Sequence, residues 1–303
     1  MKPAPPTDTD GMDHTDPSTA PAHTDLELLA KEIGELRPLG AAAQQVLRIT
    51  ATDRFSAYEI ANVIASDQAL TSKMLRLANS AYYGFARRIT TMRDAVVLLG
   101  FREVRAATLA SCVIDAMPPS NHIAYERFWQ YSLSIGMLAE VLARAERQQP
   151  DEAFTAGVVH NIGRLALDQH RPAMFGEALA YAGQHSVSLE EAERAVLGFT
   201  DAELGAALGR QWDFPAPLVA AIEHHDWKPE QLTEPQSLTG FIVRARAFAR
   251  SHGSSDGVEP PAGRTDPPAE WLLPPLAPSL ARVGGIEGLR ERASSFLTNA
   301  VQR

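Results

Sequence analysis

The sequence predicts an all-α fold in which two helical sub-bundles pack together. Apolar residues recur every three or four positions from Leu26 to Ser251, which is the period of an amphipathic helix. The strict apolar–polar alternation that predicts a β-strand is missing over the same range. Turn and capping residues separate the apolar stretches at short intervals, and this spacing is typical of a helical bundle rather than of a parallel sheet.

The first sub-bundle, residues 25–120, is expected to hold five or six short helices. Ser56 caps one of them, because Glu59 follows at the spacing of a capping box. Thr91, or Thr90, caps another helix, which stops at Gly100. The predicted helical ranges are 26–36, 41–50, 57–66, 67 or 68 to 78, 92–99 and 102–116.

The second sub-bundle, residues 121–252, shows the same helical period. Ser188 and Thr200 are expected to cap two of its helices, and Glu203 completes a capping box with Thr200. The predicted helical ranges are 128–147, 151–169, 172–184, 189–196, 200–211, 218–225 and 239–251.

Three further segments differ from these sub-bundles in composition. Residues 1–24 hold hardly any large apolar side chain and are expected to form a disordered tail. Residues 253–279 are rich in Gly, Pro and Ser and are expected to be a linker, in which Trp271 is a candidate apolar anchor. Residues 280–303 are expected to contain a C-terminal helix over 286–301.

Composition narrows the classes of function. The chain has 303 residues and a net charge of −9, which argues against a general nucleic-acid surface. Cys112 is the single cysteine, so an internal disulfide framework and a CxxC metal site are excluded. Without a long apolar run or a secretory signal, the protein is expected to be cytoplasmic and not to contact a membrane.

The stretch 151–169 reads as a single helix with two distinct faces. One face is apolar, whereas His160, Arg164 and Asp168 follow one another at intervals of four on the opposite side, and Asn161 lies at the border. An imidazole beside a carboxamide at mid-helix indicates either a site or the remnant of one. On this helix alone we favour a structural histidine, since a short motif is only a hypothesis.

Two longer motifs resemble the HDOD family, the HD-related output domains of bacterial signalling proteins. The run IASDQALTSKMLRLANSAYYG, residues 64–84, is followed by the AVVLLG of residues 95–100 and closely resembles the family signature, although Gln68 stands where proline is common. The run AFTAGVVHNIGRLAL, residues 153–167, resembles the family helix that carries a His-Asp pair. The resemblance covers roughly residues 26–251 and implies an HD-like second sub-bundle within one HDOD module.

The resemblance also implies where a metal site of HD phosphohydrolases would lie. Those enzymes bind metal through a His, a His-Asp pair and a later Asp. The corresponding positions here are Tyr131, the pair His160-Asn161 and Arg246. A neutral amide lacks the charge of aspartate, and a guanidinium repels a divalent cation. We therefore expect no bound metal, no cofactor and no catalytic activity.

Several polar residues near these positions have an open role. His224 and His225 stand where the family often has consecutive histidines, but neighbours on a helix diverge by about 100° and do not readily share one metal. We favour one histidine packing at the helix end and the other in solvent. Arg164, Arg244 and Arg246 are candidates to bind a phosphorylated ligand, although ordinary pairing with Asp168, Glu177 or Glu223 is the favoured interpretation.

The first sub-bundle offers one aromatic and basic cluster. Tyr82, Tyr83, Phe85, Arg87 and Arg88 follow one another closely and are candidate contacts for a ligand or partner. The favoured interpretation is that the tyrosines pack between helices while the arginines lie in solvent. Nucleic acid is disfavoured here by the net charge of −9.

By resemblance, the chain is expected to be a non-catalytic output or scaffold module of bacterial signal transduction. It would act by contact with other signalling proteins, and the family association points to cyclic-dinucleotide, motility or surface-behaviour signalling. Two alternatives stay open at this point. One is a nucleotide receptor that uses the vacated metal pocket, and the other is a divergent metal-dependent phosphohydrolase.

Overall fold

The computed structural model describes residues 26–36, 39–50, 56–80, 83–119, 121–258 and 265–301. The tail 1–24 and Tyr82 lie outside these residues. Over the described residues the fold is all-α and contains no strand, which confirms the predicted fold class. None of the described helices is both long enough and apolar enough to pass through a membrane.

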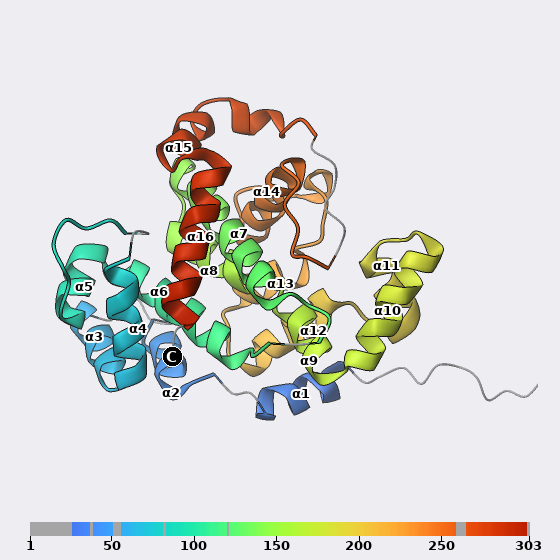
Figure 1. Cartoon of the computed structure of the whole chain (residues 1–303), viewed down its shortest axis with the longest axis horizontal. Helices are drawn as coiled ribbons and strands as arrows, with labels where there is room; N and C mark the ends of the chain where they lie inside the picture. The colour runs from blue at the N-terminus through green and yellow to red at the C-terminus, as the bar shows by residue number, and fades with distance from the viewer. Residues whose placement is uncertain are drawn as a thin grey trace, which may run out of the picture.

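The first group of helices lies at one end of the molecule (Figure 1). Their apolar faces enclose a core to which Ile60, Leu77 and Val113 contribute fully buried side chains. The helices of this group are α2 (Ala41–Thr50), α3 (Ala57–Ala65), α4 (Gln68–Ala78), α5 (Met92–Leu99) and α6 (Phe101–Ala116).

The second group is built around α7 (Tyr125–Ala145), a long helix with most of its side chains buried. Short helices surround it, and the candidate site lies among them. They are α8 (Pro150–Val159), α9 (Ile162–His170), α10 (Pro172–His185), α11 (Leu189–Leu197), α12 (Asp201–Gln211), α13 (Ala216–Glu223), the 3-10 turn η1 (Pro229–Gln231) and α14 (Leu238–Ser251).

The capping residues agree with the prediction from the sequence. Ser56, Ser188 and Thr200 each accept a hydrogen bond from the backbone N–H three residues later, and in each case a glutamate completes the capping box. Thr91 caps α5, whose C-cap is Gly100 at φ 90°. Hydrogen bonds within one turn therefore mark the starts of these four helices.

Two elements after α14 were not predicted from the sequence: the 3-10 turn η2 (Ala269–Leu272) and α15 (Leu276–Arg282). The helix that follows, α16 (Gly285–Val301), corresponds to the C-terminal helix that was expected. Trp271 docks as the sequence suggested: it is 1% exposed and stacks on Phe248 with ring centroids 4.2 Å apart. Its neighbours Leu272 and Leu273 remain exposed.

Helices near both ends of the described chain pack on elements that are remote from them in sequence (Figure 1). The first, α1 (Leu26–Leu36), packs against α12 of the second group, and Arg171 pairs with Glu32 at 2.7 Å. The last, α16, packs along α7 and also contacts α4 and α6 of the first group. Leu289, Phe296 and Leu297 of α16 are buried.

The prediction of one helix over 151–169 is wrong, because the structure has two. α8 ends at Val159 and α9 starts at Ile162, with His160 and Asn161 in the turn between them. Asn161 adopts φ −109° and ψ 18°, which lies outside the helical region. The break turns both side chains into the interior, where their exposed fractions are 0% and 1%.

Two close helix contacts hold this turn in place, and both require glycine. A Cβ atom on Gly157 of α8 would overlap the backbone of Gly136 in α7. A Cβ atom on Gly163 of α9 would overlap the backbone oxygen of Asp201 at the start of α12. These contacts bring the first turn of α12 directly against the first turn of α9, and so place Asp201 beside Arg164.

Candidate functional site

The candidate site lies where the α8–α9 turn faces α7, the end of α13, and α14. The ring of His160 lies 6.0 Å from that of Tyr131 and 5.1 Å from that of His225, centroid to centroid. Arg246 approaches from α14 and donates a hydrogen bond to the backbone oxygen of His225. Each of these four side chains is less than 10% exposed.

Both buried imidazoles are neutral. The Nδ1 atoms of His160 and His225 each lie 2.6 Å from a backbone carbonyl oxygen, of Gly157 and Ile222 respectively. A carbonyl only accepts, so Nδ1 carries the proton and Nε2 is left as an acceptor. Burial lowers the pKa of His225 to about 4 and holds the pKa of His160 well below its usual value, with Arg246 adding to both effects.

Arg246 forms an ion pair with Asp226 inside the site. Its Nη2 atom lies 2.6 Å from Oδ1 of Asp226, whose side chain is 16% exposed. Burial favours the neutral carboxyl, but Arg246 outweighs it and holds the pKa of Asp226 well below its usual range. Burial also works against the charge of Arg246, yet Asp226 and Tyr131 raise its pKa above the ordinary value. Both partners are therefore charged at neutral pH.

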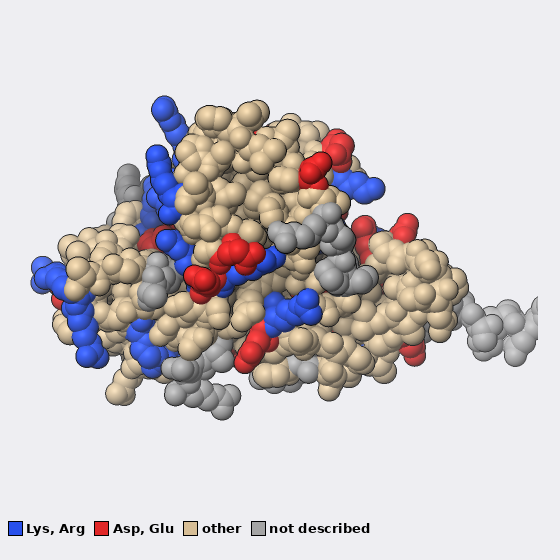
Figure 2. All heavy atoms as spheres, turned by 45° about the horizontal axis from the view of Figure 1, so that its top comes forward, with Lys and Arg blue, Asp and Glu red and all other residues tan. Residues whose placement is uncertain are grey.

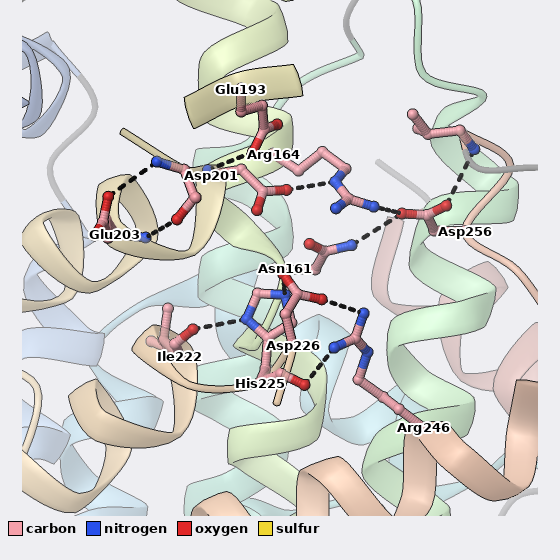
Figure 3. A network of polar contacts seen from close by, with 12 residues as sticks. Asn161, Arg164, Glu193, Asp201, Glu203, Ile222, His225, Asp226, Arg246 and Asp256 are labelled. Carbon is pink, nitrogen blue, oxygen red and sulfur yellow. Dashed lines mark hydrogen bonds and ion pairs between the residues drawn. The ribbon is translucent and has the colours of Figure 1, made fainter. Parts of the chain in front are cut away.

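A second buried guanidinium bridges two carboxylates (Figure 3). Arg164 bonds to Asp201 through Nε and to Asp256 through Nη1, the latter at 2.5 Å. Asn161 donates from Nδ2 to the same Asp256 oxygen at 3.0 Å, and the backbone N–H of Val258 donates to the other. This network joins the α8–α9 turn, the start of α12 and the segment after α14.

Glu193 of α11 completes the acidic side of this network. It is 0% exposed, and its Oε2 atom accepts a hydrogen bond from the backbone N–H of Asp201 at 2.8 Å. Burial, with Asp201 close by, raises the pKa of Glu193 well above its usual value, although Arg164 opposes the shift. Glu193 therefore lies beside Asp201 on the acidic side of Arg164.

The residues present do not fit a divalent metal of the kind that HD phosphohydrolases bind. Asp201, His225 and Asp226 each bring one potential ligand atom within 4.8 Å of the others. However, Asp201 is paired with Arg164 and Asp226 with Arg246. A divalent cation between them would stand beside two guanidinium groups, and the carboxylates would have to leave partners that already neutralise them.

Five of the six positions taken from the resemblance come together in space. Tyr131, His160, Asn161, His225 and Arg246 all contribute to the buried cluster. The sixth, His224, does not: its ring stacks on Trp227 with centroids 4.3 Å apart. The two adjacent histidines thus diverge, with one buried at the helix end and the other only partly buried.

The ion pairs in the structure differ from those expected from the sequence. Arg164 pairs with Asp201 and Asp256. Asp168 accepts hydrogen bonds from the backbone N–H groups of His122 and Ile123 and lies 2.6 Å from the His122 ring nitrogen. Arg244 pairs with Glu146 and Glu270. The sequence could not identify these partners, because they lie on other elements far away along the chain.

Burial also removes Arg164 and Asp168 from any surface that a partner protein could touch, since they are 2% and 0% exposed. Of the aromatic and basic cluster, Tyr83 is partly buried and donates from its hydroxyl to Glu103 at 3.1 Å. Arg87 and Arg88 are exposed, as the favoured interpretation expected.

The sequence interpretation missed three acidic residues of the site. Glu193 and Asp201 lie within amphipathic helices, where acidic residues are usually solvated, and Asp256 lies in the segment expected to be a linker. Of the three, only Asp201 could have been noticed in the sequence, because it follows the capping residue Thr200 at a helix start. Nothing local marks Asp256 as part of the site, because the side chains that it contacts there, Asn161 and Arg164, are far away in the sequence.

The chain belongs to the HDOD domain family. The model of this family matches residues 36–227, which are more than half of the 303 residues. A curated relative from Treponema pallidum (strain Nichols), called an uncharacterized protein, is 23% identical over 224 residues. That match covers 73% of this chain but only 44% of the relative, so the chain spans less than half of the relative's length.

Solved structures support the same fold. A "Putative phosphohydrolase" from Shewanella amazonensis SB2B is 25% identical with a TM-score of 0.69, over 92% of this chain and 99% of that chain. An HDOD domain protein with unknown function from Geobacter sulfurreducens is 22% identical with a TM-score of 0.67, over 90% and 95%. A "Putative signal transduction protein" from Marinobacter aquaeolei VT8 is 20% identical with a TM-score of 0.66, over 93% and 67%.

Proposed function

We propose that this protein is a non-catalytic signal-transduction module that acts by contact with other proteins. The observation that carries the proposal is the Arg246–Asp226 ion pair at 2.6 Å within the HD-like site. A guanidinium takes the position that the family resemblance assigns to a metal-binding carboxylate. The HDOD membership and the name of the Marinobacter protein agree with a signalling role.

The electrostatics of the site support this proposal. Metal-assisted hydrolysis needs a cation that lowers the pKa of a bound water. Here Arg164 and Arg246 already supply buried positive charge, and their carboxylate partners neutralise it. The two guanidiniums hold helices together with charge-assisted hydrogen bonds, which is a structural role rather than a catalytic one.

The test combines metal content with activity. Protein purified without a metal-chelating tag is analysed for iron, manganese and zinc, and the same sample is assayed for phosphodiesterase and phosphomonoesterase activity. We expect far less than one metal per chain and no turnover. Stoichiometric metal that disappears in His160→Ala, together with turnover, would contradict the proposal and favour the phosphohydrolase alternative.

A pull-down from cell lysate with the purified chain as bait then searches for the partner protein. A partner that is captured by the wild type, and then binds the purified chain directly, supports the scaffold role. The matched control is the Arg246→Met variant: because this site is buried, a partner that contacts the surface should still bind the variant as long as it is folded.

One observation favours the nucleotide-receptor alternative. A cavity of about 610 Å³ opens beside the site, with Asp226 and Arg246 in its wall and Lys228 and Arg250 near them. The Nε2 atom of His160 and Oδ1 of Asn161 are buried without a hydrogen-bond partner among the described residues. A nucleotide at about 100 times its Kd would stabilise the fold by about 2.7 kcal/mol, so thermal unfolding with a nucleotide panel tests this alternative.

A further inference from the structure

A second cavity lies between the two groups of helices and shares no lining residue with the cavity beside Arg246. Its volume is about 370 Å³, and its walls come from the segment after α4, from α5, α6 and α7, and from α15 and α16. This size falls in the range of about 300–1,000 Å³ that is typical of small-molecule sites. Three kinds of side chain line it, and each favours a different part of a ligand.

Arginines form the first kind. Arg144, Arg282 and Arg292 line the cavity. Arg144 pairs with Glu140 at 2.5 Å, whereas Arg282 and Arg292 form no ion pair with any carboxylate of the described residues. Figure 2 shows Lys and Arg gathered along the side of the α15–α16 region, on a chain whose net charge is −9. Arg292 also lies close enough to Glu140 to oppose the rise in the pKa of that carboxyl. Two guanidiniums that line one cavity without an ion pair among the described residues favour a phosphate group.

Aromatic and aliphatic side chains form the second kind. The rings of Tyr83 and Phe85 lie nearly parallel, 16° apart, with centroids separated by 6.4 Å, and Phe85 is 38% exposed. Leu98, Leu99 and Leu289 add apolar surface beside them. A flat ring can stack on such a surface, because every nucleobase offers a π-face to an aromatic side chain.

Two glutamates form the third kind. Glu103 accepts a hydrogen bond from the Tyr83 hydroxyl at 3.1 Å, and burial together with the nearby Glu140 raises the pKa of Glu103 to about 7. Carboxylates in this position accept hydrogen bonds and gain from N–H donors on a ligand. Guanine has two adjacent N–H donors on its pairing edge, whereas adenine places a ring acceptor there, which a carboxylate would repel.

We propose that this cavity binds a guanine nucleotide, with the base stacked near Tyr83 and Phe85, its N–H edge toward Glu103, and its phosphates toward Arg282 and Arg292. Both of these arginines lie outside residues 36–227, the range that the family model matches. The site therefore requires the C-terminal helices of this chain. It goes beyond the proposed function and does not depend on it.

The test is isothermal titration calorimetry, which measures the affinity of the full chain for GDP, ADP, guanosine and inorganic phosphate. We expect GDP to bind at least about tenfold more tightly than ADP, because a charge-assisted base contact is lost with adenine. Arg282→Ala combined with Arg292→Ala should weaken GDP by about tenfold or more. Glu103→Gln should weaken GDP but leave ADP unchanged, a readout that a merely structural role would not give.

Two control variants locate the binding. Arg290→Ala alters an arginine of the same helix that pairs with Glu287 and does not line the cavity. Lys228→Ala alters the cavity beside Arg246. Both should bind GDP like the wild type, and each variant should first show a cooperative thermal unfolding transition without ligand. No GDP binding at millimolar concentration, equal affinity for ADP or phosphate, or loss of binding in Lys228→Ala would each overturn the proposal.

Discussion

Removing Arg246 is the sharpest test of how the HD-like site is held together. Arg246→Met keeps an unbranched apolar stem and deletes the guanidinium with its charge, so Asp226 loses its ion-pair partner although its side chain is only 16% exposed. Breaking one side of such a buried pair costs about 3–5 kcal/mol. We therefore expect the variant to lose roughly that much free energy of unfolding at pH 7.5, measured by urea denaturation.

The pH dependence gives this prediction a second, independent signature. In the wild type, Arg246 holds the pKa of Asp226 below its unfolded value, so the pair stabilises the fold at neutral pH and loses that effect as the pH falls through the folded pKa. Without Arg246, burial raises the pKa of Asp226 above its unfolded value. The variant carboxyl then accepts a proton in mild acid, and the deficit relative to wild type should shrink between pH 7.5 and pH 5.

Two further variants control for other causes. Arg250→Met changes an exposed arginine one turn along α14 and should cost less than about 0.5 kcal/mol. Asp226→Asn added to Arg246→Met should recover most of the loss, because it removes the unpaired charge. A loss below about 1 kcal/mol in the single variant, or a deficit that grows in mild acid, would refute the reasoning.

Three other predictions concern the fold. Since the pKa of Glu103 rises from 4.5 to about 7, the folded chain keeps a proton that the unfolded chain releases, and stability falls by at most about 3 kcal/mol as the pH rises through this window. Glu103→Gln should therefore be more stable than wild type at pH 8 but not at pH 4, and an equal difference at both would count against this. Gly163→Ala should lower the free energy of unfolding by about 1–3 kcal/mol in a urea titration, because the added Cβ atom overlaps the α12 backbone. In the control Gly183→Ala the added Cβ atom has no neighbour within 4 Å, so this variant should be slightly more stable than wild type. Trp271→Ala should cost about 3–5 kcal/mol in the same titration, while Leu272→Ala, at 62% exposure, should not lower the midpoint measurably.

Local chemistry allowed most of the fold to be predicted. Helix starts at Ser56, Thr91, Ser188 and Thr200 depend on residues within one turn, and these side chains cap helices as expected. The turn at Asn161 could not be predicted in the same way. It depends on Asp256, which accepts from Asn161 across 95 positions of sequence, and no periodicity within the helix reports such a contact.

The candidate site could be predicted only in part for the same reason. The resemblance identified Tyr131, His160 and Arg246 because motif positions carry over between relatives. The carboxylates that neutralise the arginines come from other elements, so their identity depends on tertiary packing. The prediction for Arg164 could not name Asp201 and Asp256, because they lie 37 and 92 positions away along the sequence.

The packing of α1 on α12 and of α16 on α4 and α6 has a consequence for how the chain acquires its structure. Each end of the described chain covers the group of helices that is remote from it in sequence. During synthesis, the first group must wait with an uncovered apolar face until α16 leaves the ribosome, and α1 must wait for α12. Contacts of such long sequence separation slow folding and prolong the exposure of apolar surface, so chaperones should engage this chain before α16 is made.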